Sequence, residues 1–167
     1  MKFVLANDHG GIDLAPAVIE KLEELGHEVI HIGTMDKNSV DYSDYAVKAC
    51  EKINNKEADL GILICGTGLG MSISANKVKG IRAACVSDVY SAKMSRAHNN
   101  ANVLCIGARV LGSELCKLIV ETFATTEFEG ERHQRRIDKI TKIEENQWDF
   151  VVSIFVWKYF SYNYKYV

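Results

Sequence analysis

Three features that would place this chain in a familiar class are missing from its 167 residues. The 20 Lys and Arg residues are balanced by 22 Asp and Glu residues, and the net charge of −2 gives no basic excess for binding nucleic acid or an anionic membrane. No run of about eighteen apolar residues occurs, and no basic segment followed by an apolar core precedes residue 30. We therefore expect no membrane span and a cytoplasmic location.

The five cysteines also lack a recognisable pattern, because no two of them form a Cys-x-x-Cys pair. They lie at positions 50, 65, 85, 105 and 116, in otherwise apolar segments. This spacing indicates neither a zinc knuckle nor a disulfide framework, and reduced thiols are the simplest interpretation. With 47% apolar and 25% charged residues, the chain is long enough for one compact domain with a full core.

Short β-rich runs alternate with longer helical ones along the chain. We expect strands at residues 2–7, 28–32, 58–65, 82–87 and 102–107, and helices at 13–25, 41–53, 69–77, 89–98, 113–125 and 131–145. Gly26 is expected to stop a helix, and Asp41 and Ser113 to cap two others. Near-continuous apolar strands are typical of a sheet buried on both faces. The sequence therefore predicts an α/β fold, a three-layer α/β/α Rossmann-like domain with a five-stranded parallel sheet.

One predicted strand runs directly into Cys65 and then into glycines at 66, 68 and 70. Such glycines allow positive φ and bring successive N–H groups close to an anion. Met71 stands where a dinucleotide fingerprint needs glycine and where a Cys-x5-Arg phosphatase needs arginine, and no lysine follows Gly70 as a Walker loop requires. An oxyanion-binding or sugar-binding nest is one interpretation, and a tight strand-to-helix turn around a buried cysteine is the other.

Ligands of parallel α/β domains bind beyond the carboxyl ends of the strands, and several polar residues are predicted to lie there. Asp8 and His9 follow the first strand and suit sugar hydroxyls or a phosphate, although Asp8 alone could also cap a helix. Ser87 and Asp88 follow the fourth strand. His98 ends a helix, a place where histidine is favoured without any catalytic role.

Three arginines are candidates for binding an anion. Arg132 and Arg136 are one helical turn apart, which allows two guanidinium groups to hold one phosphate dianion. A solvated charged face would give the same pattern. Arg109, after the fifth strand, is a further candidate with an equally plain surface interpretation.

Five segments together carry a resemblance that none carries alone. They are NDHGG at 7–11, CGTGLGMSISANK at 65–77, SRAHNNAN at 95–102, GAR at 107–109 and GERHQRR at 130–136. In these segments and their order, from residue 1 to about 146, the chain resembles ribose-5-phosphate isomerase of the B type. The resemblance implies that D-ribose 5-phosphate and D-ribulose 5-phosphate are interconverted by moving a proton between C1 and C2, with no metal or organic cofactor.

Two alternatives remain open beside that function. Isomerases of allose 6-phosphate and galactose 6-phosphate belong to the same superfamily. A non-catalytic module that binds sugar phosphates would keep the glycine loop and the arginines, but it would not need Cys65, Thr67 and His98 together.

The resemblance also assigns roles to individual residues. Cys65 matches the catalytic base, and its thiolate would need stabilisation by the loop amides or a nearby cation. Some members of the family place a glutamate further along this loop, at the position of Met71 or Ser72 here, but no carboxylate lies between Cys65 and Asp88. Thr67 would move protons between oxygens or orient the sugar. The backbone N–H groups of the loop would stabilise the enediolate oxygens, and these belong to Gly66, Thr67, Gly68, Leu69 and Gly70.

The remaining roles concern ring opening and binding. His98 matches the group that opens the sugar ring, Asp8 would hold the ring oxygen and hydroxyls, and Asn99 would bind the sugar. The matched phosphate and binding contacts are His9, Arg109, Arg132 and Arg136.

The resemblance further implies a homodimer or a dimer of dimers, in which His98 and Asn99 face the Cys65 loop of the partner subunit. We expect an isomerase domain at residues 1–146 and an extension at 147–167. The segment from Trp148 to Val167 contains nine of the chain's fifteen aromatic residues. We expect this extension to pack on the dimer surface.

Overall fold

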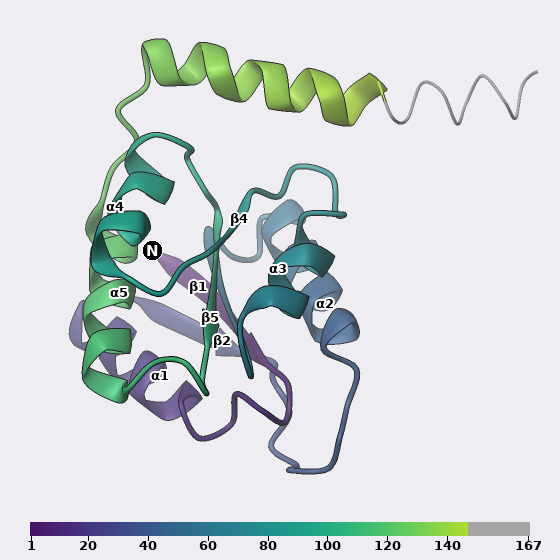
Figure 1. Cartoon of the computed structure of the whole chain (residues 1–167), viewed down its shortest axis with the longest axis vertical. Coiled ribbons are helices and arrows are strands. Elements are labelled where there is room, and N and C mark those ends of the chain that lie inside the picture. Colours follow the sequence, from purple (N-terminus) through teal and green to yellow (C-terminus); the bar gives the residue numbers. More distant parts are fainter. Residues whose placement is uncertain (147–167) are drawn as a thin grey trace, which may run out of the picture. The chain divides into compact units, whose positions relative to one another are not determined.

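The computed structural model describes residues 1–146, and the helices and strands alternate along most of that length (Figure 1). The strands are β1 (Lys2–Asn7), β2 (Glu28–His31), β3 (Leu60–Cys65), β4 (Ala83–Cys85) and β5 (Val103–Gly107). Each strand is followed by a helix, and these helices are α1 (Ala15–Glu24), α2 (Tyr42–Asn54), α3 (Leu69–Ala75), α4 (Val89–Ala97) and α5 (Ser113–Thr125). A further helix covers residues 132–146.

The five strands form one parallel sheet in the order β2-β1-β3-β5-β4. The predicted α/β fold with a five-stranded parallel sheet is therefore confirmed. The chain leaves β1 toward β2 on one side, while β3, β5 and β4 follow on the other side, so the order reverses between β1 and β3. A ligand crevice is expected beyond the carboxyl ends of two strands at such a point, which here are Asn7 and Cys65.

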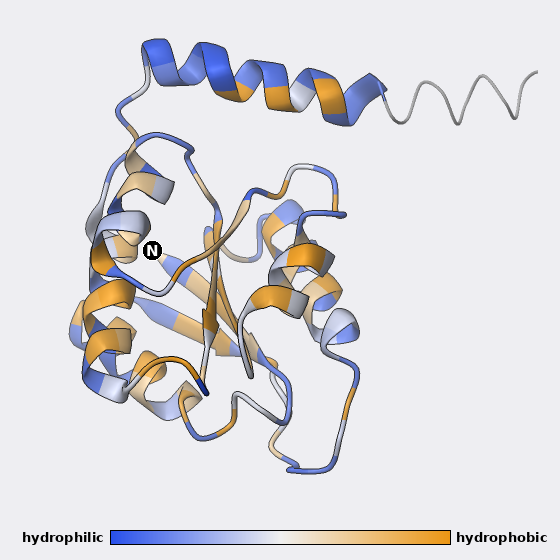
Figure 2. Cartoon of the chain, viewed as in Figure 1, coloured by the Kyte–Doolittle hydropathy of each residue, from blue (hydrophilic) through white to orange (hydrophobic). Residues whose placement is uncertain are grey.

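Helices cover both faces of the sheet and bury a separate apolar cluster on each. Side chains of α1, α4 and α5 pack with Phe3, Ile62 and Leu104 on one face. Side chains of α2 and α3 pack with Val4 and Leu63 on the other. Figure 2 shows that the strands and the helix sides turned toward them are the apolar parts of this layered structure. Burial on both faces explains why the strands are apolar along their whole length.

Three residues were predicted to begin or end a helix, and the structure agrees with the prediction for some of them and not for others. Gly26 has φ of 77°, and the N–H groups of Gly26 and His27 donate to the carbonyls of Glu23 and Leu22, so the predicted stop after α1 is confirmed. The predicted cap at Ser113 is wrong, because Gly112 holds the N-cap position and Ser113 is already helical. Asp41 holds the N-cap position of α2 as predicted, but its side chain makes no capping hydrogen bond.

The chain divides into two compact units, Met1–Gly130 and a second unit that begins at Glu131. The sheet and helices α1 to α5 all belong to the first unit. The predicted extension at 147–167 lies outside the described residues. Among residues 1–146, every helix is too short or too polar to cross a bilayer.

Candidate active site

Three loops meet at the carboxyl edge of the sheet and are joined by backbone hydrogen bonds. The N–H of Asp8, after β1, donates to the carbonyl of Ile64 at 3.1 Å. After β5, the N–H groups of Ala108 and Arg109 donate to the carbonyls of Cys65 and Gly66 at 2.9 and 3.0 Å. The structure therefore brings Asp8, Cys65 and Arg109 to one place.

The loops approach so closely that a Cβ atom would clash with backbone at Gly107 and would meet backbone in a tight contact at Gly10. A Cβ atom on Gly107 would lie 2.7 to 2.8 Å from three backbone atoms of Thr67. A Cβ atom on Gly10 would lie 3.1 Å from the backbone nitrogen of Gly66. Backbone contacts cannot yield as a flexible side chain can, so these two glycines fix the separation of the three loops.

Cys65 is 5% exposed at the end of β3. Its Sγ accepts a hydrogen bond from the N–H of Gly68 at 3.1 Å. The chain reaches this geometry because Gly68 has φ of 80°, which L side chains rarely adopt. An N–H donor aimed at sulfur stabilises negative charge on that sulfur, as a nucleophilic or basic thiolate requires.

The expectation of positive φ at all three loop glycines is right for Gly68 and wrong for Gly66 and Gly70. Position 70 needs a glycine for a different reason, because a Cβ atom there would lie 2.8 Å from the ring of Tyr42. A Cβ on Gly66 would make only an ordinary contact of 3.5 Å with the side chain of Arg109. The loop therefore owes its shape to one left-handed residue and to one tight contact with an aromatic ring.

Two amides of the loop are occupied by the loop itself. The Gly68 N–H reaches the sulfur, and the Leu69 N–H donates to Oγ1 of Thr67 at 3.4 Å. Within residues 1–146, the N–H groups of Gly66 and Thr67 have no protein acceptor. Among the described residues the Gly70 N–H, in the first turn of α3, has no protein acceptor either, so three of the five predicted amide donors are left for a ligand, and those of Gly66 and Thr67 follow Cys65 directly.

Asp8 and His9 are both held in defined orientations. Oδ1 of Asp8, a residue that is 5% exposed, accepts from the N–H of Gly10 at 2.8 Å. This bond closes a turn well before α1 begins at Ala15, so Asp8 does not cap that helix. Nδ1 of His9 accepts from the N–H of Val40 at 3.2 Å, which leaves the proton of a neutral imidazole on Nε2.

His9 and Arg109 line one cavity of about 370 Å³ next to the Cys65 loop. Its other lining residues are Gly10, Asp13, Leu14, Ala108 and Ser113. The carboxylate of Asp13 is paired with Lys37 at 3.2 Å. The guanidinium of Arg109 and the imidazole of His9 offer the N–H donors that an anionic group needs.

The other predicted ring-opening and sugar-binding residues, His98 and Asn99, lie at the opposite edge of the sheet. Helix α4 returns from the carboxyl end of β4 to the amino end of β5, and His98 is its C-cap. The carbonyl of Asn99 accepts from Nε of Arg82, which directly precedes β4, at 3.1 Å. Nε2 of His98 lies 3.6 Å from the Glu129 carboxylate. One chain therefore does not bring His98 and Cys65 together.

Arg132 and Arg136 lie one turn apart in the helix at 132–146, and both side chains are exposed. The predicted helical spacing is thus present. This helix belongs to the second unit and is described by itself.

Sequence reasoning missed two residues beside the loop. The ring of Tyr42 contacts Gly70, and no local pattern pairs residues so far apart in the chain.

Cys85, the second missed residue, ends β4 at the same carboxyl edge, and its position at the end of a predicted strand could have identified it. Its sulfur lies 3.8 Å from the carbonyl oxygen of Thr67, and although the residue as a whole is exposed, partial burial of the thiol raises its pKa. Because Cys85 is exposed and Cys65 is buried, a thiol reagent tests Cys65 only in a Cys85→Ser chain.

Comparison with protein families gives a match to the ribose/galactose isomerase model over residues 3–140. Among curated proteins, ribose-5-phosphate isomerase B of Escherichia coli is 46% identical over 146 residues, which cover 87% of this chain and 98% of that protein.

Solved structures give the same result. Ribose-5-phosphate isomerase B of Clostridium thermocellum superposes with a TM-score of 0.86 at 48% identity, covering 88% of this chain and 99% of the other. The enzyme of the same name from Mycoplasma genitalium, solved with bound ribulose-5-phosphate, has a TM-score of 0.81 at 43% identity and covers 86% of this chain and 96% of its own.

Proposed function

The chain belongs to the ribose/galactose isomerase family, and from that premise we propose that it interconverts D-ribose 5-phosphate and D-ribulose 5-phosphate. The observation that carries this proposal is the sulfur of Cys65, which meets the Gly68 N–H at 3.1 Å among the loops that close the carboxyl edge of the sheet. A sugar phosphate over this loop would have a base and two open amide donors within reach of adjacent carbons.

In the proposed reaction, the thiolate of Cys65 removes the proton on C2 of the open-chain aldose. The C2–H electrons form the C1–C2 double bond, and the carbonyl oxygen on C1 takes the negative charge of the enediolate. The N–H groups of Gly66 and Thr67 stabilise that oxygen. The Thr67 hydroxyl passes a proton between the oxygens of C1 and C2, and the Cys65 thiol then returns its proton to C1, which yields the ketose.

The phosphate is assigned to the cavity lined by His9 and Arg109, where an imidazole N–H and a guanidinium are available. Arg132 and Arg136, an exposed pair one helical turn apart, match further phosphate contacts of the family, and we propose that role for them. Asp8 has one carboxylate oxygen engaged by Gly10, and its other oxygen is left to hold the sugar ring oxygen or a hydroxyl.

We further propose that the working unit is a homodimer or a dimer of dimers. His98 and Asn99 lie at the amino edge of the sheet, whereas Cys65 lies at the carboxyl edge, so ring opening beside Cys65 needs His98 from a second copy. Separating the subunits would then abolish turnover while each chain stays folded. The five cysteines are all free thiols in the structure, which agrees with the proposed cytoplasmic location.

The proposed substrate is tested by a panel of sugar phosphates. We expect the purified chain to form ketose from D-ribose 5-phosphate with a higher kcat/KM than from allose 6-phosphate or galactose 6-phosphate. Turnover of a hexose phosphate alone would move the function to the alternative isomerases of the superfamily. A folded chain that binds ribose 5-phosphate and converts none of the three would favour the binding module.

Replacing Arg109 with alanine is expected to raise the KM for ribose 5-phosphate by about 10- to 100-fold, because a hydrogen bond to a charged group contributes roughly 1.5–3 kcal/mol. We expect kcat to change much less, since Arg109 would bind the phosphate equally in substrate and transition state. Steady-state kinetics of Arg109→Ala beside Arg135→Ala, an exposed arginine with no proposed contact, would check this. An unchanged KM in Arg109→Ala would remove Arg109 from the phosphate site.

A further inference from the structure

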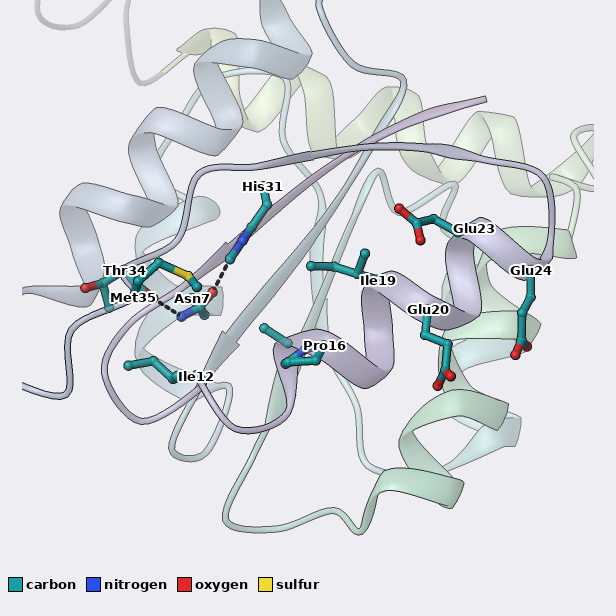
Figure 3. Close-up of a pocket in the computed structure, with 11 residues that line it drawn as sticks. Asn7, Ile12, Pro16, Ile19, Glu20, Glu23, Glu24, His31, Thr34 and Met35 are labelled. Atoms are coloured by element: carbon teal, nitrogen blue, oxygen red, sulfur yellow. Dashed lines mark hydrogen bonds between the residues drawn. The ribbon is translucent and has the colours of Figure 1, made fainter.

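Asn7 is a fully buried polar residue that joins three segments behind the Asp8 loop. Its Nδ2 donates to the carbonyl of Asp8 at 3.1 Å and to the carbonyl of Thr34 at 2.9 Å. Its Oδ1 lies 2.7 Å from Nε2 of His31, at the end of β2 (Figure 3). Every polar atom of the Asn7 amide is therefore satisfied.

The direction of each hydrogen bond follows from chemistry. Nδ2 faces two carbonyl oxygens, so it must be the nitrogen, and Oδ1 is left as an acceptor toward His31. His31 must then carry a proton on Nε2. Burial lowers the pKa of His31, which keeps the ring neutral at physiological pH with its one N–H on this nitrogen.

Residues 33 and 34, which follow β2, pack directly against the side-chain amide of Asn7. A Cβ atom on Gly33 would lie 2.0 Å from Oδ1 of Asn7, which excludes any side chain at that position. The N–H of Thr34 donates to the carbonyl of Asn7 at 3.0 Å. The Asn7 amide thus holds the Asp8 peptide through its carbonyl and is itself held by His31 and residues 33–34.

Asn7 and His31 do not belong to the cavity assigned to the phosphate. Together with Thr34 they line a second cavity of about 620 Å³, which includes Ile12 and Ile19 (Figure 3). The linings of the two cavities share no residue. Asn7 therefore acts on the first cavity through the backbone of the loop that carries Asp8 and His9.

We propose that Asn7 and His31 are positioning residues for the isomerase reaction, because their hydrogen bonds fix the peptide that aims the side chains of Asp8 and His9. The inference rests on the proposed function, in which Asp8 and His9 contact the sugar phosphate. A misplacement of about 1 Å in such groups costs on the order of 10²-fold in rate.

Three histidine variants test the role of the His31 N–H. His31→Leu removes the donor, whereas His31→Gln keeps an N–H near the position of Nε2. His27→Leu is the matched control, because His27 is also a partly buried histidine whose pKa is lowered by burial, and it lies before β2, away from the Asp8 loop. We expect kcat/KM to fall by about 10- to 100-fold in His31→Leu, and to stay within about 3-fold of wild type in His31→Gln and His27→Leu.

A mutant cycle separates positioning from general loss of structure. If His31 acts through Asp8 and His9, then adding His31→Leu should cost less than about 2-fold in kcat/KM in a chain that already carries Asp8→Asn and His9→Ala. The same loss in both backgrounds, with no rescue by His31→Gln, would overturn the inference.

A measurement without turnover keeps this inference separate from the proposed function. We expect the backbone amide NMR signals of residues 8–10 to shift in His31→Leu and to keep their wild-type positions in His31→Gln and His27→Leu. Unmoved signals in a folded His31→Leu chain would overturn the positioning role even if the wild-type chain converted no sugar phosphate. Conversely, shifted signals in a chain inactive on every sugar phosphate would support the positioning of the loop and refute the proposed function.

Discussion

Replacing Cys65 with alanine is expected to lower kcat for D-ribose 5-phosphate by about 10²- to 10⁴-fold, the range that a positioned acid–base group contributes. The sulfur is the only titratable side-chain atom that the β3 loop brings to its glycine amides, and no carboxylate follows before Asp88. The variant keeps the Gly66 and Thr67 amides and the phosphate cavity. We therefore expect KM to change little, and steady-state kinetics would separate the two effects.

Cys116→Ala is the matched control for Cys65→Ala, because it makes the same chemical change at a fully buried cysteine on α5. Burial raises the pKa of Cys116 to about 11, so this group stays a thiol at neutral pH. We expect the control to lose some stability and to keep its kcat. A Cys65→Ala chain that is folded and as active as the control would remove Cys65 from the role of base.

Replacing Gly107 with alanine is expected to lower kcat/KM by about 10²-fold although Gly107 touches no substrate. Its added Cβ would lie within 2.8 Å of three backbone atoms of Thr67, so the Cys65 loop or the end of β5 must move. Overpacking of this kind also lowers the free energy of unfolding by about 1–3 kcal/mol. Kinetics and urea unfolding of the same preparation would measure both losses.

Gly112→Ala provides the control for Gly107→Ala. Gly112 has φ of −75°, and no atom lies within 4 Å of a Cβ built there. Alanine is less favourable than glycine at an N-cap position, so this variant should lose about 0.5–1 kcal/mol of stability and keep its kcat/KM. Equal activity in the two variants would show that the contact between Gly107 and Thr67 does not hold the catalytic loop.

The sheet and the edge that carries the loops could be predicted because each depends on local information. Apolar runs such as that of β3 identify buried strands, and the parallel arrangement then places Asp8 and Cys65 at the same edge. The roles proposed for His98 and Asn99 come from the resemblance to the isomerase family. The direction of α4 explains in physical terms why these two residues cannot serve the Cys65 of their own chain.

The features that the sequence did not reveal depend on contacts between distant segments. Gly70 looked like a residue chosen for positive φ, yet the ring of Tyr42 explains it better. None of the sequence motifs includes His31, and only the folded sheet places it beside Asn7. Ser113 looked like a helix cap, but the helix begins one residue earlier than its side chain suggested, since Gly112 already occupies the N-cap position. Periodicity carries no information about such pairings.

The role of Cys65 as base is tested most directly by following exchange of the C2 hydrogen of ribose 5-phosphate with solvent in D₂O by NMR. We expect the wild-type chain to introduce deuterium at C2 of the aldose and C1 of the ketose. We expect Cys65→Ala, with its fold intact, to introduce almost none. Deuterium incorporation at the wild-type rate in Cys65→Ala would contradict the assignment of Cys65 as the base that moves the proton.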